Sequence, residues 1–121
     1  MASNIVRFDE LRYITYTALA TPSAFVAFGF VTSQSTPAPF DHAMRVLNFK
    51  NTTDADIYIS YDGVTINDIV AKSTFDLYDL TSDQDANEMF RYQSGTQVYA
   101  ASVAMPTKGY IGLTSIYGKG E

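Results

Sequence analysis

The chain lacks cysteine and tryptophan, and it contains a single histidine, His42, among its 121 residues. Without cysteine it forms no disulfides, no thiolate metal sites and no thiol nucleophile. Charged residues are also scarce, at 17% against the roughly 25% of an average soluble domain. With 13 acidic and 8 basic residues the net charge is −5, which argues against sequence-specific nucleic acid as a partner.

Long hydrophobic runs are missing too. No apolar stretch approaches the roughly 18 residues of a membrane-spanning helix. The first residues lack the apolar segment of a secretory signal peptide. We therefore expect no membrane partner and a protein that is made and used without crossing a membrane. The length predicts one domain, and the 46% of hydrophobic residues suffice for one core.

Aromatic residues are abundant instead, since nine Tyr and eight Phe make up 14% of the chain. Tyrosine favours β-strands and protein contact surfaces. The acidity is concentrated in residues 51–88, where nine acidic residues accompany one lysine. We interpret this segment as a series of solvated acidic turns. The uneven charge could also favour head-to-tail packing of copies of the chain.

Short strands with frequent turns account for almost the whole sequence. The run 57–61 alternates in the period of a strand and ends at Asp62-Gly63, a strong hairpin signal. The spacing predicts an all-β fold, a single-domain antiparallel β-sandwich (jelly-roll-like) of about eight strands over residues 1–121, with an N-terminal arm. The expected strands are residues 5–8, 12–19, 24–32, 44–50, 57–61, 64–70, 73–80, 88–93, 96–104 and 110–117, with a hairpin turn near Pro106 between the last two.

A proline-containing loop is predicted at residues 33–41. We expect this loop to be mobile in the free subunit and fixed in an assembly, and the first 40 residues to carry the assembly contacts. The reason is that Phe25, Phe28, Phe30 and Phe40 are more rings than the sandwich buries easily by itself. The predicted core consists of Phe25, Val26, Phe28, Leu47, Phe49, Ile57, Ile59, Phe75, Leu77, Val98, Ile111 and Leu113.

Candidate chemical sites are weak throughout. His42 follows Asp41, but no nucleophilic serine signature accompanies them, so we interpret His42 as an ordinary loop residue. The segment Asp83–Glu88 resembles the start of a calcium loop, yet Glu88 stands where the required glycine belongs. A solvated turn is favoured there, and cation binding stays open. Asn51-Thr52-Thr53 matches a glycosylation acceptor that we expect to be idle. We predict no catalytic, cofactor-binding or metal-binding residues, no cofactor and no enzyme activity.

Several longer runs resemble a known family. The resemblance begins with Glu10-Leu11-Arg12 and is strongest from Arg45 to Tyr117. The runs that carry it are residues 51–65, 73–81, 94–99, 106–111 and 116–118. They resemble small virion structural proteins of tailed double-stranded DNA bacteriophages, over about three-quarters of the chain. The stretch 33–40 departs from that pattern, because it is longer and richer in proline.

The resemblance implies a non-enzymatic, multi-copy structural protein of the virion, and it transfers no site residues. The first expectation is a capsid decoration or cement protein that stabilises the head. The alternatives are a head-tail connector in a neck or tail ring, whose acidic segment would line a DNA channel, and a carbohydrate-binding module of a fibre or spike. The implied partners are further copies of the chain and either the major capsid protein or the portal and neck proteins.

Overall fold

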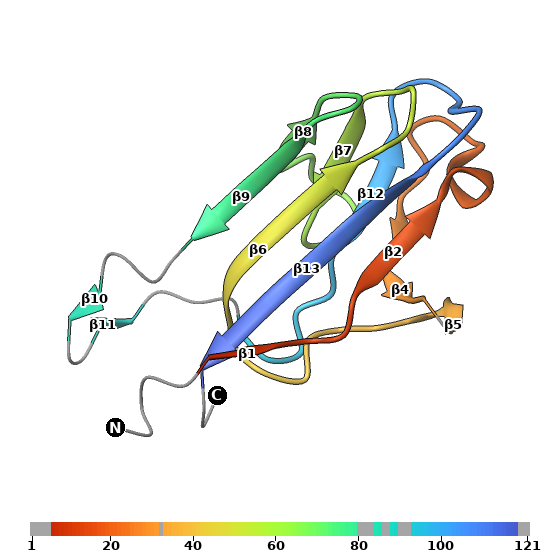
Figure 1. Ribbon diagram of the computed structural model, residues 1–121. Coiled ribbons are helices and arrows are strands. Elements are labelled where there is room, and N and C mark those ends of the chain that lie inside the picture. The colour runs from red at the N-terminus through yellow and green to blue at the C-terminus, as the bar shows by residue number, and fades with distance from the viewer. Residues whose placement is uncertain (1–5, 32, 80–83, 86–87, 90–92, 119–121) are drawn as a thin grey trace.

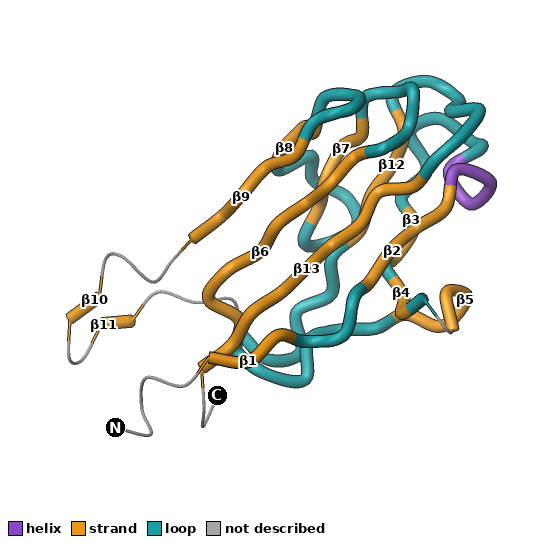
Figure 2. The backbone as a smooth tube through the Cα atoms, in the orientation of Figure 1, coloured by secondary structure: helices purple, strands orange, loops and turns teal. Residues whose placement is uncertain are grey.

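The computed structural model describes residues 6–31, 33–79, 84–85, 88–89 and 93–118. Two antiparallel sheets pack face to face with a shared hydrophobic core between them, and Figure 1 shows them as two layers. The predicted antiparallel β-sandwich is confirmed. Outside the strands, Figure 2 shows loops and, in purple, the short 3₁₀ helix η2 (Tyr16–Leu19).

The larger sheet is built around its longest strand, β13 (Tyr110–Gly118), which pairs with three neighbours. Its strand order is β5-β4-β2-β13-β6-β9, and β1 also pairs with β13. The other members are β1 (Val6–Phe8), β2 (Arg12–Thr15), β4 (Gly29–Phe30), β5 (Ser33–Pro37), β6 (Met44–Asn51) and β9 (Phe75–Asp79).

The smaller sheet has the order β3-β12-β7-β8. It consists of β3 (Val26–Ala27), β7 (Ile57–Ser60), β8 (Asp68–Val70) and β12 (Tyr99–Ser102). Strands β7 and β8 form the hairpin that Asp62-Gly63 predicts, and Gly63 has the positive φ of +80° that this turn requires. A separate two-stranded pairing joins β10 (Gln84–Asp85) to β11 (Glu88–Met89).

The core lies between the sheets and follows the alternation of each strand. In β7, Ile57 and Ile59 are fully buried, and they face Leu47 and Phe49 of β6 within the same cluster. Eight of the twelve predicted core residues are buried in this cluster: Phe28, Leu47, Phe49, Ile57, Ile59, Val98, Ile111 and Leu113. Val26 packs against it while partly exposed, and Phe25 is half-buried.

Two predicted core residues, Phe75 and Leu77, lie on the wrong face of their strand. They are 67% and 58% exposed. Strand β9 pairs with β6 so that Asp76 lies opposite Phe49 and Tyr78 opposite Leu47. Residues opposite each other in a sheet share a face, so Asp76 and Tyr78 point inward. The ring of Tyr78 packs edge-on against Phe49, with centroids 5.9 Å apart, and this contact sets the phase of the strand.

The segment predicted as the proline-containing loop is also corrected. Residues Ser33–Pro37 form strand β5, which pairs with β4. Beyond it, Ala38 and Phe40 are buried in the sandwich. The Ala38 amide donates to the Phe28 carbonyl at 3.0 Å, and the Phe40 amide donates to the Thr96 carbonyl at 3.0 Å. Ala38 and Phe40 therefore pack on their own domain, whereas the mobility expected for this segment in the free subunit stays a prediction.

Three predicted strands change sheet or end early. The run 24–32 splits at Phe28, so that β3 belongs to the small sheet and β4 to the large one. The pairing of β4 with β5 is irregular, because its register shifts between Gly29 and Phe30. The run 12–19 stops at Thr15, because η2 turns the chain across the sandwich and buries Leu19. Strands β12 and β13 lie in different sheets, so residues 103–109 are a crossing and the predicted hairpin near Pro106 is wrong.

Candidate functional site

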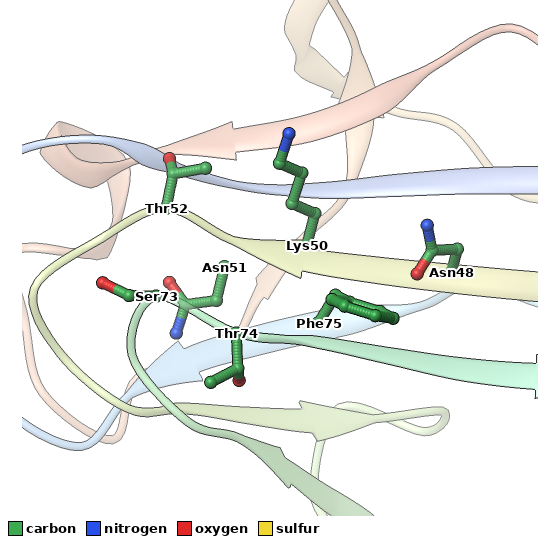
Figure 3. A pocket seen from close by; sticks show the side chains of 7 residues that line it. All are labelled: Asn48, Lys50, Asn51, Thr52, Ser73, Thr74 and Phe75. Atoms are coloured by element: carbon green, nitrogen blue, oxygen red, sulfur yellow. The ribbon is translucent and has the colours of Figure 1, made fainter.

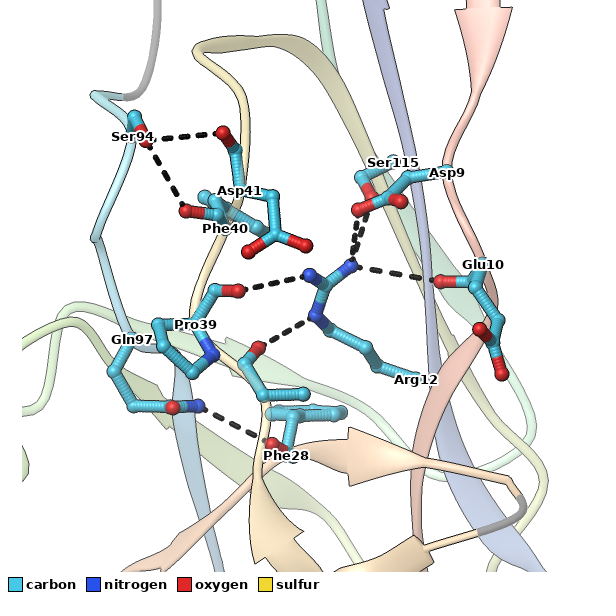
Figure 4. Close-up of polar contacts among 11 residues, drawn as sticks. Asp9, Glu10, Arg12, Phe28, Pro39, Phe40, Asp41, Ser94, Gln97 and Ser115 are labelled. Atoms are coloured by element: carbon cyan, nitrogen blue, oxygen red, sulfur yellow. Dashed lines mark hydrogen bonds and ion pairs between the residues drawn. The ribbon is translucent and has the colours of Figure 1, made fainter.

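A buried arginine fastens the N-terminal strands to the segment after β5. The guanidinium of Arg12 is completely buried, and Figure 4 shows it directed between Asp9 and residues 38–40. Its Nε donates to the Ala38 carbonyl at 2.6 Å, and its Nη2 donates to the Pro39 carbonyl at 3.1 Å. Its Nη1 donates to the Asp9 carboxylate at 2.7 Å.

Aromatic rings complete the surroundings of this guanidinium. The Arg12 carbon Cζ lies 4.7 Å from the ring centroid of Phe30 and 5.1 Å from that of Phe40. A further contact runs from Nη1 to the Ser115 hydroxyl of β13 at 3.3 Å. A buried charge is tolerated only when it is paired and hydrogen-bonded, and Arg12 meets both conditions. These contacts occupy the guanidinium with protein groups, so Arg12 is a structural clasp.

The outer face of the large sheet carries apolar side chains and very little charge. The register places Phe75, Lys50, Gly112 and Tyr13 in one row across β9, β6, β13 and β2. Among the side chains described on this face, only Lys50 is charged. The other outward residues are Phe8, Thr15, Val46, Asn48, Leu77, Tyr110, Thr114 and Ile116.

A shallow hollow opens on this face beside Phe75. It has a volume of about 550 Å³ and lies between the end of β6 and the turn that precedes β9. Figure 3 shows the Phe75 ring lying alongside β6, with Lys50 and Asn48 projecting from that strand. The rest of the lining is polar: Asn51, Thr52, Ser73 and Thr74. The hollow therefore combines one aromatic ring, one cation and several hydroxyl and amide groups.

The turn after β7, residues 61–67, is held by a dense set of local hydrogen bonds and is called the 61–67 loop below. The carboxylate of Asp62 accepts from the amides of Val64 at 2.8 Å and Thr65 at 2.7 Å. It also accepts from the hydroxyls of Ser60 and Thr65, both at 2.9 Å. These donors, above all the two backbone amides, hold the pKa of Asp62 far below its usual range.

At the tip of this loop two apolar side chains point into solvent. Val64 is 80% exposed and Ile66 is 51% exposed. The Asn67 side chain accepts from the Tyr61 amide at 2.9 Å, and the Asn67 amide donates to the Ile59 carbonyl at 2.8 Å. The 61–67 loop therefore presents its apolar tip and its ionised Asp62 on a fixed backbone.

Two aspartates meet where the edge of the small sheet approaches the edge of the large sheet. Asp76 of β9 is partly buried and interacts with Asp68 of β8. Burial raises the pKa of Asp76, and the hydrogen bond and negative charge of Asp68 raise it further. An inward acid pair on strands at the edges of their sheets also discourages edge-to-edge pairing with another chain.

The pKa of Asp54 is shifted in the opposite direction. The hydroxyl and the amide of Thr107 donate to its carboxylate, and these hydrogen bonds lower its pKa.

The predicted glycosylation acceptor is blocked in the folded chain. Asn51 is 1% exposed, and its Nδ2 donates to the carbonyls of Ala55 at 2.9 Å and Val70 at 3.1 Å. Its Oδ1 accepts from the amide and hydroxyl of Thr53. A glycan on Nδ2 would break this network, so the sequon marks a structural turn.

The remaining candidate sites from the sequence are His42 and the possible calcium loop Asp83–Glu88. His42 stacks on Tyr117 with ring centroids 3.8 Å apart and an angle of 6° between the planes. Half of Asp83–Glu88 lies outside the described residues, which leaves its cation binding untested. Within the described ranges, no three acidic or histidine side chains gather to hold a metal ion. No helix in that part of the chain is long and apolar enough to span a membrane.

The sequence did not predict the buried position of Arg12 or the exposure of Phe75 and Leu77, and the reasons differ. A buried arginine looks like any surface arginine until its distant acceptors are known. The exposure of Phe75 and Leu77 depends on which face of β9 points toward the core, and only the pairing of β9 with β6 decides this. Comparison of the chain with known protein families, with curated proteins and with solved structures finds no match.

Proposed function

We propose that the chain is a non-enzymatic, multi-copy structural protein in the virion of a tailed bacteriophage, where it decorates the capsid and stabilises the head. One observation carries the proposal: the folded chain leaves large apolar side chains exposed on both layers. Exposed apolar side chains that lie together, as Phe75 and Leu77 do on one face of β9, are typical of protein contact sites. The residues are Phe8, Val64, Phe75 and Leu77.

The runs behind the family resemblance support a structural role. Residues 51–65 contain Asn51 and Asp62, and both side chains serve to fix turns by hydrogen bonding. The Glu10-Leu11-Arg12 run contains the Arg12 clasp. A sequence pattern that specifies turns and a buried clasp specifies a rigid module. Rigidity reduces the entropy lost when many copies are immobilised in a particle.

A neck or tail ring is the second candidate. The exposed acids Asp54, Asp56 and Asp62 favour it, because an acidic wall repels DNA phosphates and would let DNA slide past. Both candidates imply further copies of the chain as partners. They differ in the other partner, which is the major capsid protein for decoration and the portal or neck proteins for a ring.

Copy number in purified particles tests the proposal. Particles of the phage that encodes the chain are purified, and its peptides are quantified by mass spectrometry against those of the major capsid and portal proteins. Decoration predicts an abundance comparable with the major capsid protein. A ring predicts an abundance comparable with the portal protein. Absence of the chain from purified particles would refute both candidates.

A further inference from the structure

Two exposed apolar features of the chain carry opposite charge. The first, the outer patch, consists of Phe75, Leu77 and Lys50 on the outer face of the large sheet. The second is the tip of the 61–67 loop, with Val64 and Ile66 beside Asp62. Lys50 has no carboxylate within ion-pair distance among the side chains that the structure describes.

We propose that the 61–67 loop of one copy packs on the outer patch of a second copy, in a head-to-tail contact. This inference rests on the proposed multi-copy function and identifies the surfaces that would join neighbouring copies. Apolar contact between Val64, Ile66 and the Phe75 ring would supply the attraction. The charge pair of Lys50 with Asp62 would set the orientation, as complementary charges do across interfaces.

One copy cannot satisfy both features by itself. The loop closes the β7–β8 hairpin of the small sheet, whereas the outer patch faces away from that sheet on the other layer (Figure 1). The turns 52–56 and 71–74 lie at the hollow's end of the sandwich, and the loop lies at the other end of β7 and β8. Each copy therefore offers one donor and one acceptor surface, an arrangement that builds rings or open stacks.

The two surfaces also suit each other in shape and rigidity. The hollow of about 550 Å³ beside Phe75 is open to solvent and has room for projecting aliphatic side chains. The hydrogen bonds around Asp62 fix the loop before any contact forms. A preorganised loop loses little conformational entropy on docking, which favours the contact. The same hydrogen bonds lower the pKa of Asp62 and so favour its negatively charged form.

The test uses two variants of the full chain and a mixing experiment. The patch variant carries Phe75→Ser and Leu77→Ser, and the loop variant carries Val64→Ser and Ile66→Ser. The matched control is Met105→Ser, which removes an apolar side chain of similar exposure elsewhere on the surface. Circular dichroism and thermal unfolding verify that each variant folds. Sedimentation velocity over a range of concentrations measures self-association.

A head-to-tail contact predicts four results. The wild-type chain and the Met105→Ser control associate as concentration rises, and each double variant associates at least about ten-fold more weakly, equivalent to about 1.4 kcal/mol. A mixture of the two variants forms dimers that grow no further, because exactly one intact pair of surfaces remains between them. Reversing the charge with Lys50→Glu also weakens association.

Other results would overturn the inference. A wild-type chain that stays monomeric at all concentrations rules the contact out. A loop variant that associates like wild type, while the patch variant does not, means that the patch packs on another surface. Two monomeric variants whose mixture also stays monomeric indicate a symmetric contact that needs both features on each copy. None of these results bears on the presence of the chain in virions, which copy counting tests separately.

Discussion

Arg12 shows how one residue joins segments that are distant in the sequence. Its guanidinium bonds Ala38 across 26 residues and Ser115 across 103 residues. It brings β2, β13 and the segment after β5 together at one point. In place of a purely apolar contact, the sandwich uses a buried charge whose directional donors specify a single arrangement of these segments.

The clasp predicts a large effect on stability. Arg12→Ala should lower the free energy of unfolding by about 3–5 kcal/mol, because it leaves the Asp9 carboxylate and two buried carbonyls without their donor. The exposed Lys50→Ala serves as the control and should change it by less than about 0.5 kcal/mol. Urea unfolding followed by circular dichroism measures both. A loss below about 1 kcal/mol for Arg12→Ala would mean that water replaces the guanidinium and the clasp is dispensable.

At the same scale, Asp76 gives stability a pH dependence of unusual sign. Its pKa is raised in the folded chain above the ordinary value of 3.8, so the folded state binds this proton more tightly than the unfolded state. Protonated Asp76 therefore stabilises the folded state at acidic pH, and this stabilisation is lost as the pH rises through the folded-state pKa. Asp76→Asn should therefore unfold at a higher temperature than wild type at pH 7, with the difference shrinking below pH 4.

Asp54→Asn is the control of opposite sign. The pKa of Asp54 is lowered by Thr107, so its contribution is present at neutral pH and is lost as pH falls. This variant should be less stable than wild type at pH 7 and approach it in acid. Thermal unfolding from pH 3 to pH 8 compares the three chains. An Asp76→Asn chain that is less stable than wild type at pH 7 would contradict the account of the acid pair.

Among the elements, β9 carries the apolar side chains that we propose contact a second copy, because its pairing with β6 places Phe75 and Leu77 on the outer face. Its phase predicts that Phe75→Ser changes the free energy of unfolding by less than about 1 kcal/mol, because the ring is exposed. Tyr78→Ser should lower it by more than about 2 kcal/mol, because that ring packs on Phe49. The same urea titration ranks the two. If Phe75→Ser lowered the free energy of unfolding more than Tyr78→Ser, then Phe75 rather than Tyr78 would face the core.

The success of sequence reasoning varied from strand to strand for physical reasons. In β7 the large aliphatic residues Ile57 and Ile59 share one face, so the alternation has only one sensible phase. In β9 both faces offer apolar or aromatic groups, and the pairing with β6 decides between them. The prolines at 37 and 39 suggested a loop, yet Ser33–Pro37 form a strand, and Ala38 and Phe40 hydrogen-bond to other parts of the sandwich.

The candidate site was less predictable than the fold. Composition indicated contact surfaces rich in aromatic residues, and the acidic segment suggested head-to-tail packing. Neither could locate the surfaces, because the outer patch depends on strand register and the 61–67 loop depends on side-chain hydrogen bonds to its own backbone. Arg12 lay beyond sequence reasoning altogether, since its acceptors are assembled only by tertiary structure.

In the whole molecule, the interior and the outer surfaces have different roles. The interior and the Arg12 clasp make a rigid sandwich, and the outer surfaces keep apolar groups that packing within the chain does not cover. In the assembly that we propose, neighbouring subunits cover Phe75, Leu77 and Val64, and burying these side chains stabilises the particle. In the same proposal, the negative charge of the acidic turns opposes aggregation of the free subunit before assembly.

Hydroxyl-radical footprinting tests this central claim most directly, because it reports side-chain exposure in the free chain and in purified particles. The account predicts that oxidation of Phe75 and Leu77 falls several-fold in particles, while the buried Phe49 is protected in both states. Equal oxidation of Phe75 and Leu77 in the free chain and in particles would contradict it, because the outer patch would then remain uncovered in the assembled state.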